Sequence, residues 1–206
     1  MDNFHYRELF GRALAANVVN IAKAGSSNRR IIRTTVDYIE NNPVDLVVLG
    51  LTFYDRQEIP ILAQPKPREG HWVSYNSQGF QGTFIDTTDE LIDATYRMGD
   101  DYVKTRYRFD INEHYLEQLY LDLRMFAAYC QTKNVKYCIF NTCDKHHRNV
   151  DLGPGFIPFS FIGNEYMEQN GVTCMEQDLV LPQNARHHYG EDAIILVKYL
   201  VDFIND

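Results

Sequence analysis

Two short apolar runs constrain the fold of this chain more than any other feature. They are Asp45-Leu-Val-Val-Leu-Gly50 and Val135-Lys-Tyr-Cys-Ile-Phe140. A short run that is apolar nearly throughout is typical of a strand buried on both faces of a parallel sheet. A third run, Asn17-Val-Val-Asn-Ile-Ala22, indicates another short buried strand. We therefore expect a sheet of at least these three strands.

Apolar residues at helical spacing alternate with these strands. Strands that alternate with helices imply right-handed crossovers and a sheet covered on both sides. The pattern predicts a mainly parallel three-layer α/β/α sandwich, in one domain over residues 1–206. Proline and glycine break up a loop-rich insertion at about 52–86, with a hairpin around Trp72-Val-Ser-Tyr75. Helices are predicted over 4–16, 31–39, 88–97, 112–132 and 190–204.

Composition narrows the classes of function. A length of 206 residues with 45% hydrophobic residues suits one domain, and a net charge of −8 argues against nucleic acid as a partner. No apolar run approaches the roughly 20 residues that span a bilayer, and the first residues do not resemble a signal peptide. The four cysteines lack CxxC spacing, so we expect reduced thiols.

Ligands in open parallel sheets bind beyond the carboxyl ends of the strands. The turn Gly25-Ser-Ser-Asn28 lies there, and its backbone N–H groups would support an oxyanion. The alternative is an ordinary helix cap made by Ser27 or Asn28. Thr52 and Arg56 follow the strand predicted over 45–50. There they would bind an acyl or sugar oxygen or else tie down the insertion.

The pair His187-His188 immediately precedes the last predicted helix, so one imidazole is a candidate general base. A hydrolase base normally needs a carboxylate that orients it. The residues three positions before His187 and His188 are instead Asn184 and Ala185. A second pair, His146-His147, has no acidic or cysteine ligands spaced to complete a coordination shell. We therefore expect no metal and no other cofactor.

Four stretches together resemble the SGNH (GDSL-like) hydrolase superfamily, particularly a branch common in large tailed bacteriophages. They are 20–33, 45–52 followed by Arg56, Gly70-His-Trp72 and His188-Tyr-Gly-Glu-Asp-Ala193. They occur in family order. The resemblance implies a flavodoxin-like sandwich.

The resemblance also implies ester or acetyl hydrolysis by a serine–histidine pair. Gly25 matches the family glycine, and His188 matches the catalytic histidine, with His187 as the second choice. The family's first strand and its Gly-Asp-Ser nucleophile have no counterpart, and Thr52 stands nearest to the oxyanion asparagine. Hydrolysis would require Ser26 or Ser27 to be recruited as the nucleophile. An upstream in-frame segment carrying the missing strand is a further reading.

These departures set the expectations for fold and function. Without the first strand, the strands from Val18 and Leu46 either pair directly or accept a segment of another chain between them. We expect an impaired or inactive SGNH-type protein that serves as a phage virion or assembly component, in the host cytoplasm or the virion. Its partners would be viral structural proteins or a second copy, bound through the aromatic-rich insertion over 60–84. The alternative is a serine esterase or deacetylase acting on acylated carbohydrate.

Overall fold

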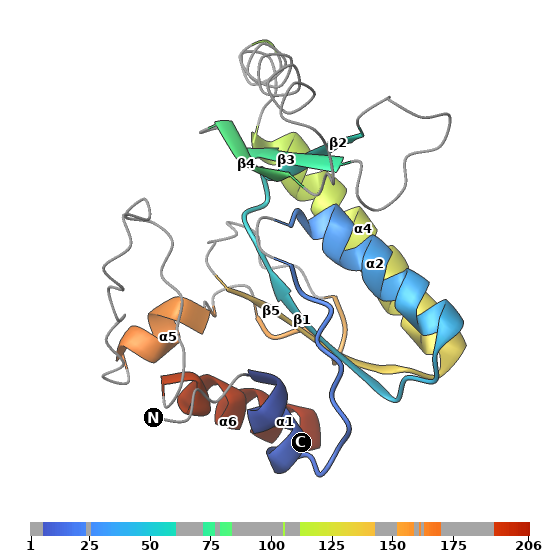
Figure 1. Cartoon of the computed structure of the whole chain (residues 1–206), viewed down its shortest axis with the longest axis vertical. Helices are drawn as coiled ribbons and strands as arrows, with labels where there is room; N and C mark the ends of the chain where they lie inside the picture. The colour runs from blue at the N-terminus through green and yellow to red at the C-terminus, as the bar shows by residue number, and fades with distance from the viewer. Residues whose placement is uncertain are drawn as a thin grey trace. The chain divides into compact units, whose positions relative to one another are not determined.

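The computed structural model of the chain describes residues 6–23, 26–60, 72–76, 79–83, 105, 112–142, 152–158, 161, 163–169 and 192–206. Contacts divide the chain into two compact units. The first unit comprises Met1–Ile21, Val48–Gly50 and Tyr137–Asp206, and the second comprises Ala22–Val47 and Leu51–Lys136. The predicted helix over 88–97 lies outside the described residues. The named elements are α1 (Tyr6–Ala13), α2 (Asn28–Asn41), β1 (Leu46–Leu51), β2 (Gln57–Pro60), β3 (Trp72–Asn76), β4 (Gly79–Thr83), α4 (Asn112–Lys133), β5 (Lys136–Asn141), α5 (Gly163–Gln169) and α6 (Asp192–Asn205) (Figure 1).

β1 and β5 pair side by side in a two-stranded sheet. At the start of both strands the Lys136 N–H donates to the Asp45 carbonyl at 2.9 Å. At their ends the strands approach so closely that a Cβ on Gly50 would lie 2.8 Å from Cγ2 of Thr142. The first residues of β1 and β5 lie side by side and so do their last residues, so the two strands are parallel. Both predicted strands are confirmed, each displaced by one residue.

The other edge of β5 carries a short parallel segment. The Ile139 N–H donates to the Gly155 carbonyl at 2.8 Å, and the Ile157 N–H donates to the Ile139 carbonyl at 3.0 Å. Gly155 is required at this approach, because a Cβ there would collide with the Tyr137 ring. The residues of β5 from Cys138 onward are all buried. Because successive side chains point to opposite faces, both faces of β5 are covered.

The core of the first unit lies where α1 and α6 contact each other and pack against strand residues. Its aromatic edge is formed by the Phe161 and Tyr199 rings, which stack with their centroids 4.6 Å apart, and Tyr166 lies beside both. The buried members of this core are Phe10, Cys138, Phe140, Ile157, Leu196, Val197, Leu200 and Val201. This packing explains the apolar stripe from which the C-terminal helix is predicted.

Two helices end in the same left-handed turn. After α1, Ala15 has a φ of 48°, and the Ala16 N–H donates back to the Gly11 carbonyl at 3.1 Å. After α4, Asn134 has a φ of 56°. This arrangement is the Schellman motif, which satisfies carbonyls at the end of a helix. It ends α1 earlier than the predicted boundary at residue 16.

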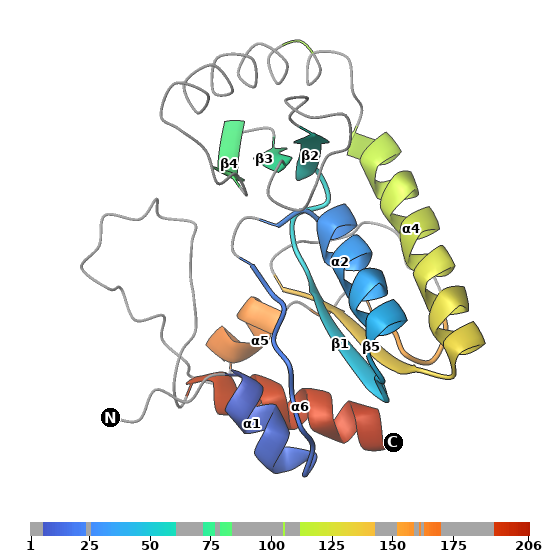
Figure 2. The same ribbon diagram turned by 45° about the vertical axis from the view of Figure 1, so that its right-hand side comes forward.

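In the second unit α2 packs along α4, as both ribbon views show (Figures 1 and 2), and β2 contacts α2. β2, β3 and β4 form a separate antiparallel sheet. Gln57 pairs with Tyr75 between β2 and β3, and Asn76 pairs with Gly79 between β3 and β4. The predicted hairpin is therefore confirmed, and it belongs to a three-stranded sheet inside the predicted insertion.

The predicted strand over Asn17–Ala22 is wrong. These residues belong to no strand. Val18 packs on the core of the first unit, but Val19 is 51% exposed and Ile21 is also exposed. β-branched residues alone therefore did not make this run a buried strand, because no strand among the described residues forms a hydrogen-bonded ladder with it. Direct pairing of this segment with β1 is wrong for the same reason, and insertion of another chain stays a prediction.

Two further elements complete the description. α5 begins at Gly163, where the glycine lies close to the Asn141 carbonyl and to side chains of Phe140 and Leu196. None of the helices in the described parts of the chain is long and apolar enough to cross a bilayer.

Candidate functional site

The candidate site is the turn that leads into α2, together with the loop that follows β1. Five of the residues predicted to bind or react lie there: Ser26, Ser27, Asn28, Thr52 and Arg56. All five belong to the second unit, and the first three are buried. Gly25, His187 and His188, which complete the predicted site, lie outside the described residues.

Ser27 is the N-cap of α2. Its backbone is extended, with φ −80° and ψ 162°, and its hydroxyl accepts a hydrogen bond from the Arg30 N–H at 3.1 Å. Its carbonyl accepts the first helical bond, from the Ile31 N–H at 3.0 Å. An N-cap hydroxyl satisfies one of the helix's otherwise unpaired donors. The capping alternative of the sequence analysis is therefore confirmed for Ser27, whose side chain is fully buried.

Ser26 is held on three sides. Its hydroxyl donates to the Lys23 carbonyl at 2.6 Å and accepts from Nη1 of Arg30 at 2.9 Å. Its carbonyl accepts a hydrogen bond from Nη1 of Arg56 at 3.4 Å. A serine nucleophile gives its hydroxyl proton to a base such as histidine. Here that proton points at a carbonyl, which is not a base.

Asn28 joins the start of α2 to the end of β1. Its Oδ1 accepts from the Thr52 N–H at 2.8 Å, while its Nδ2 donates to the Thr52 carbonyl at 3.0 Å and lies 3.4 Å from that of Phe53. The side-chain amide thereby bonds the Thr52 backbone as a neighbouring strand would. The structure brings together two predicted ligand-binding residues, and they bind each other.

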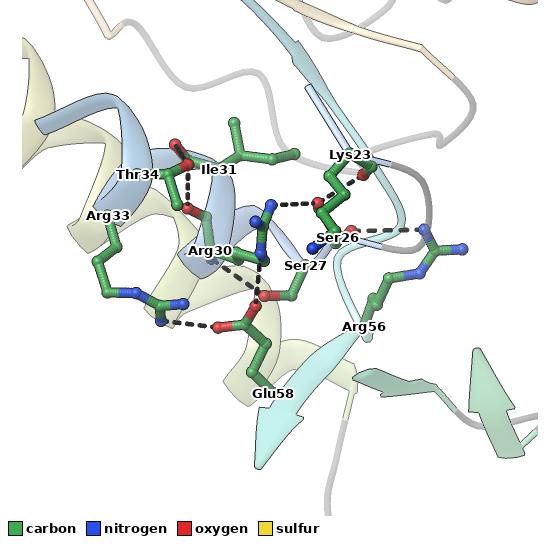
Figure 3. A network of polar contacts seen from close by, with 9 residues as sticks. All are labelled: Lys23, Ser26, Ser27, Arg30, Ile31, Arg33, Thr34, Arg56 and Glu58. Carbon is green, nitrogen blue, oxygen red and sulfur yellow. Dashed lines mark hydrogen bonds and ion pairs between the residues drawn. The ribbon is translucent and has the colours of Figure 1, made fainter. Parts of the chain in front are cut away.

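A buried ionic cluster supports the same turn (Figure 3). The Glu58 side chain, on β2, is only 2% exposed. Its Oε2 lies 2.7 Å from Nη1 of Arg33, and its Oε1 lies 3.9 Å from Nε of Arg30. Two guanidinium groups of α2 therefore meet one buried carboxylate. The Arg30 side chain is 5% exposed and that of Arg33 is 31% exposed, so the Glu58 charge depends on these partners more than on water.

Arg56 closes the arrangement from the loop side. Besides its bond to Ser26, its guanidinium lies over the Phe53 ring, 5.3 Å from the centroid. Hydrogen bonds and ion pairs thus connect the turn, α2, the end of β1 and β2. The chemical effect of these contacts is to fix four backbone segments, namely the turn, α2, the end of β1 and β2, in position relative to one another. Of the two readings offered for Arg56, the structure shows the tethering contact.

Sequence reasoning missed Arg30, Arg33 and Glu58. One signal was present: three arginines lie at the start of α2 and no acidic residue is in its first turn. Positive charge opposes the dipole at a helix N-terminus, so a compensating carboxylate had to come from elsewhere. Its position in the proline-rich insertion gave no periodicity from which to locate it.

Comparison of the chain with protein-family models, with curated proteins and with solved structures finds no match. Among the described residues, no three histidine, cysteine or acidic side chains are grouped to hold a metal ion. The pair His146-His147 lies outside them.

Proposed function

We propose that this chain is a catalytically inactive protein of the SGNH type that serves as a component of a phage virion or of its assembly. The observation that carries the proposal is the state of the two candidate nucleophiles. Ser27 caps α2 and Ser26 is bonded to Lys23 and Arg30, and both are buried. Neither hydroxyl is placed to attack a substrate.

The oxyanion side of the site supports the same proposal. An oxyanion hole needs N–H donors aimed at the position where charge develops. The Thr52 N–H already donates to Oδ1 of Asn28 at 2.8 Å, and Nδ2 of Asn28, the side-chain donor, already donates to the Thr52 carbonyl at 3.0 Å. A substrate would have to break this pair before either group could stabilise it.

A structural role for the network suits an assembly component. The bonds from Asn28 and Glu58 fix β2 and the end of β1 to α2. The start of the insertion, from residue 52 to β2, is thereby tied to α2, and a contact surface that is preorganised binds with less loss of entropy. We place the contacts with viral structural proteins on the insertion over 60–84.

The proposal extends to the fold. The burial of both faces of β5, and the parallel order of β1 and β5, support a flavodoxin-like three-layer α/β/α sandwich. In the complete chain, helices would cover both faces of this sheet.

Hydrolysis of a short-chain aryl acetate, with a fluorophosphonate probe for activated serines, tests the absence of catalysis. We expect no turnover above that of buffer and no labelled serine, with an active serine esterase as the positive control. Turnover that disappears in His188→Ala, or labelling of Ser26 or Ser27, would instead establish the esterase alternative.

The assembly role needs its own test. Mass spectrometry of purified particles and of assembly intermediates, from the phage that carries the gene, should find this chain at a defined copy number. Its absence from both would contradict the proposal, whatever the outcome of the hydrolysis assay.

A further inference from the structure

The segment between α1 and α2 is exposed over residues 19–23, none of which belongs to a helix or strand. We call residues 19–23 the linker. Val19 is 51% exposed and Ile21 is 38% exposed, and residues two apart in an extended chain lie on the same face. The boundary between the two compact units also falls inside the linker, between Ile21 and Ala22. The linker is therefore a connection between units that carries two exposed apolar side chains.

The part of the chain before the linker packs on the core of the first unit. Phe10 of α1 is buried in the same core cluster as Leu200 of α6, and Leu9 and Val18 pack against that cluster. Both ribbon views show α1 lying against α6 (Figures 1 and 2). We call residues 6–18 the arm. Its docking site on α6 is thus defined by contacts that the structure contains.

A second copy of the chain carries the same arm and the same docking site. Exchange of an identical element between two copies keeps the contacts of that element, so it is a low-cost route to a dimer. The linker has to take a new course in such an exchange, because it joins the arm to the rest of the chain. Since all five of its residues are exposed, a new course sacrifices little packing.

Exchange also provides a partner for the exposed apolar side chains of the linker. In a two-fold dimer the two linkers pass each other in opposite directions. An antiparallel pairing centred on Asn20 sets Val19 of each copy opposite Ile21 of the other copy, and the backbone groups of these two residues would form the hydrogen-bonded pairs. Apolar cross-strand pairs stabilise such a ladder. We propose that two copies of this chain exchange their arms and pair their linkers through Val19 and Ile21.

This inference does not depend on the proposed function. The contacts of the arm are the same in monomer and dimer, so the short ladder between the linkers is the new contact, and the dimer should be weak and concentration-dependent. Interconversion should be slow, because the buried Phe10 has to leave the core before the arm can dock on another copy. A dimer isolated at high concentration should therefore persist for a time after dilution.

Sedimentation velocity of the full chain over a range of concentrations tests the linker pairing. The wild type should dimerise, and the double variant Val19→Asn, Ile21→Asn should raise the dissociation constant by about tenfold. Its thermal midpoint should not change, because both side chains are exposed in the monomer. Met125→Asn, at an exposed apolar residue of α4, is the matched control and should dimerise like the wild type. A wild type that stays monomeric, or a dimer untouched by the double variant, would overturn the proposal.

An isotope experiment tests the exchange of arms separately. Leu9 is replaced by the photoreactive residue p-benzoylphenylalanine, and equal amounts of isotope-labelled and unlabelled chain are refolded together from urea. After irradiation of the isolated dimer, about half of the crosslinks between α1 and α6 peptides should join a labelled to an unlabelled chain, because copies pair at random. The isolated monomer is the control, in which each such crosslink should join peptides of one isotope. A dimer whose crosslinks also join peptides of one isotope only would overturn the exchange.

Discussion

At the scale of single residues, Asn28 shows how a predicted ligand-binding side chain became a structural one. It makes its bonds to Thr52 while almost fully buried. Asn28→Ala would leave the Thr52 N–H without this acceptor, and it should lower the free energy of unfolding by about 1–3 kcal/mol. Asn41→Ala, at the exposed end of the same helix, should change it by no more than about 0.5 kcal/mol. Urea unfolding followed by circular dichroism measures both, and equal effects would contradict the role given to Asn28.

Glu58 is a second residue whose contribution to the free energy of unfolding depends on burial. Glu58→Gln keeps the size of the side chain but removes the charge that faces Arg30 and Arg33. Breaking one partner of a buried ion pair should lower the free energy of unfolding by about 3–5 kcal/mol. Glu40→Gln removes a carboxylate from an exposed pair with Lys133, and water screening should make its effect far smaller. Guanidinium unfolding midpoints that shift equally in the two variants would show that the Glu58 pair is not shielded.

How much of this site the sequence could predict follows from the same residues. The rule that strand ends share one edge placed Asn28 and Thr52 near each other, and the structure shows them in contact although the strand predicted before Asn28 does not form. Their role was not readable, because an asparagine that binds backbone and one that binds a ligand look alike in a sequence. Glu58 was missed because β2 contacts α2 across a long separation in sequence, and no local sequence pattern indicates such a contact.

At the scale of elements, apolar runs alone did not distinguish a strand from an extended segment. The runs that became β1 and β5 pair with each other, and their residues are largely buried. The run over Asn17–Ala22 has similar β-branched content, but no strand in the described part of the chain pairs with it, and its Val19 and Ile21 are exposed. Strand formation is decided by the partner, which local sequence does not reveal.

Helix ends give a prediction at the same scale. Ala15 has a φ of 48°, in the left-handed region where an alanine Cβ is strained and glycine is not. Ala15→Gly should therefore raise the free energy of unfolding by about 0.5–1 kcal/mol. Ala13→Gly, inside the last turn of α1, should lower it by about the same amount. Thermal unfolding compares the two, and destabilisation by both would contradict the left-handed cap.

At the scale of the whole molecule, the chain does not divide where its strands end. Val48–Gly50 of β1 belongs to the first unit, while the remaining residues of β1 belong to the second. β5 likewise begins in the second unit at Lys136 and continues in the first. A strand cannot lose its order in one unit and keep all its pairing in the other. We therefore expect the two units to unfold as one domain.

Two buried thiols allow this expectation to be measured. Cys130 belongs to the second unit and Cys138 to the first. Burial raises the pKa of Cys130 to about 11 and that of Cys138 to about 12, so at pH 8 the folded protein holds almost no reactive thiolate at either position.

Pulses of iodoacetamide along a urea gradient, read by peptide mass spectrometry, should modify both thiols at the same urea concentration, since unfolding exposes them together. Cys130→Ser is the control: if the modification of Cys138 does not depend on the other thiol, its dependence on urea concentration should be the same in this variant. Separate midpoints would mean that shared strands do not couple the units, and that the chain is two domains rather than the one predicted from its length.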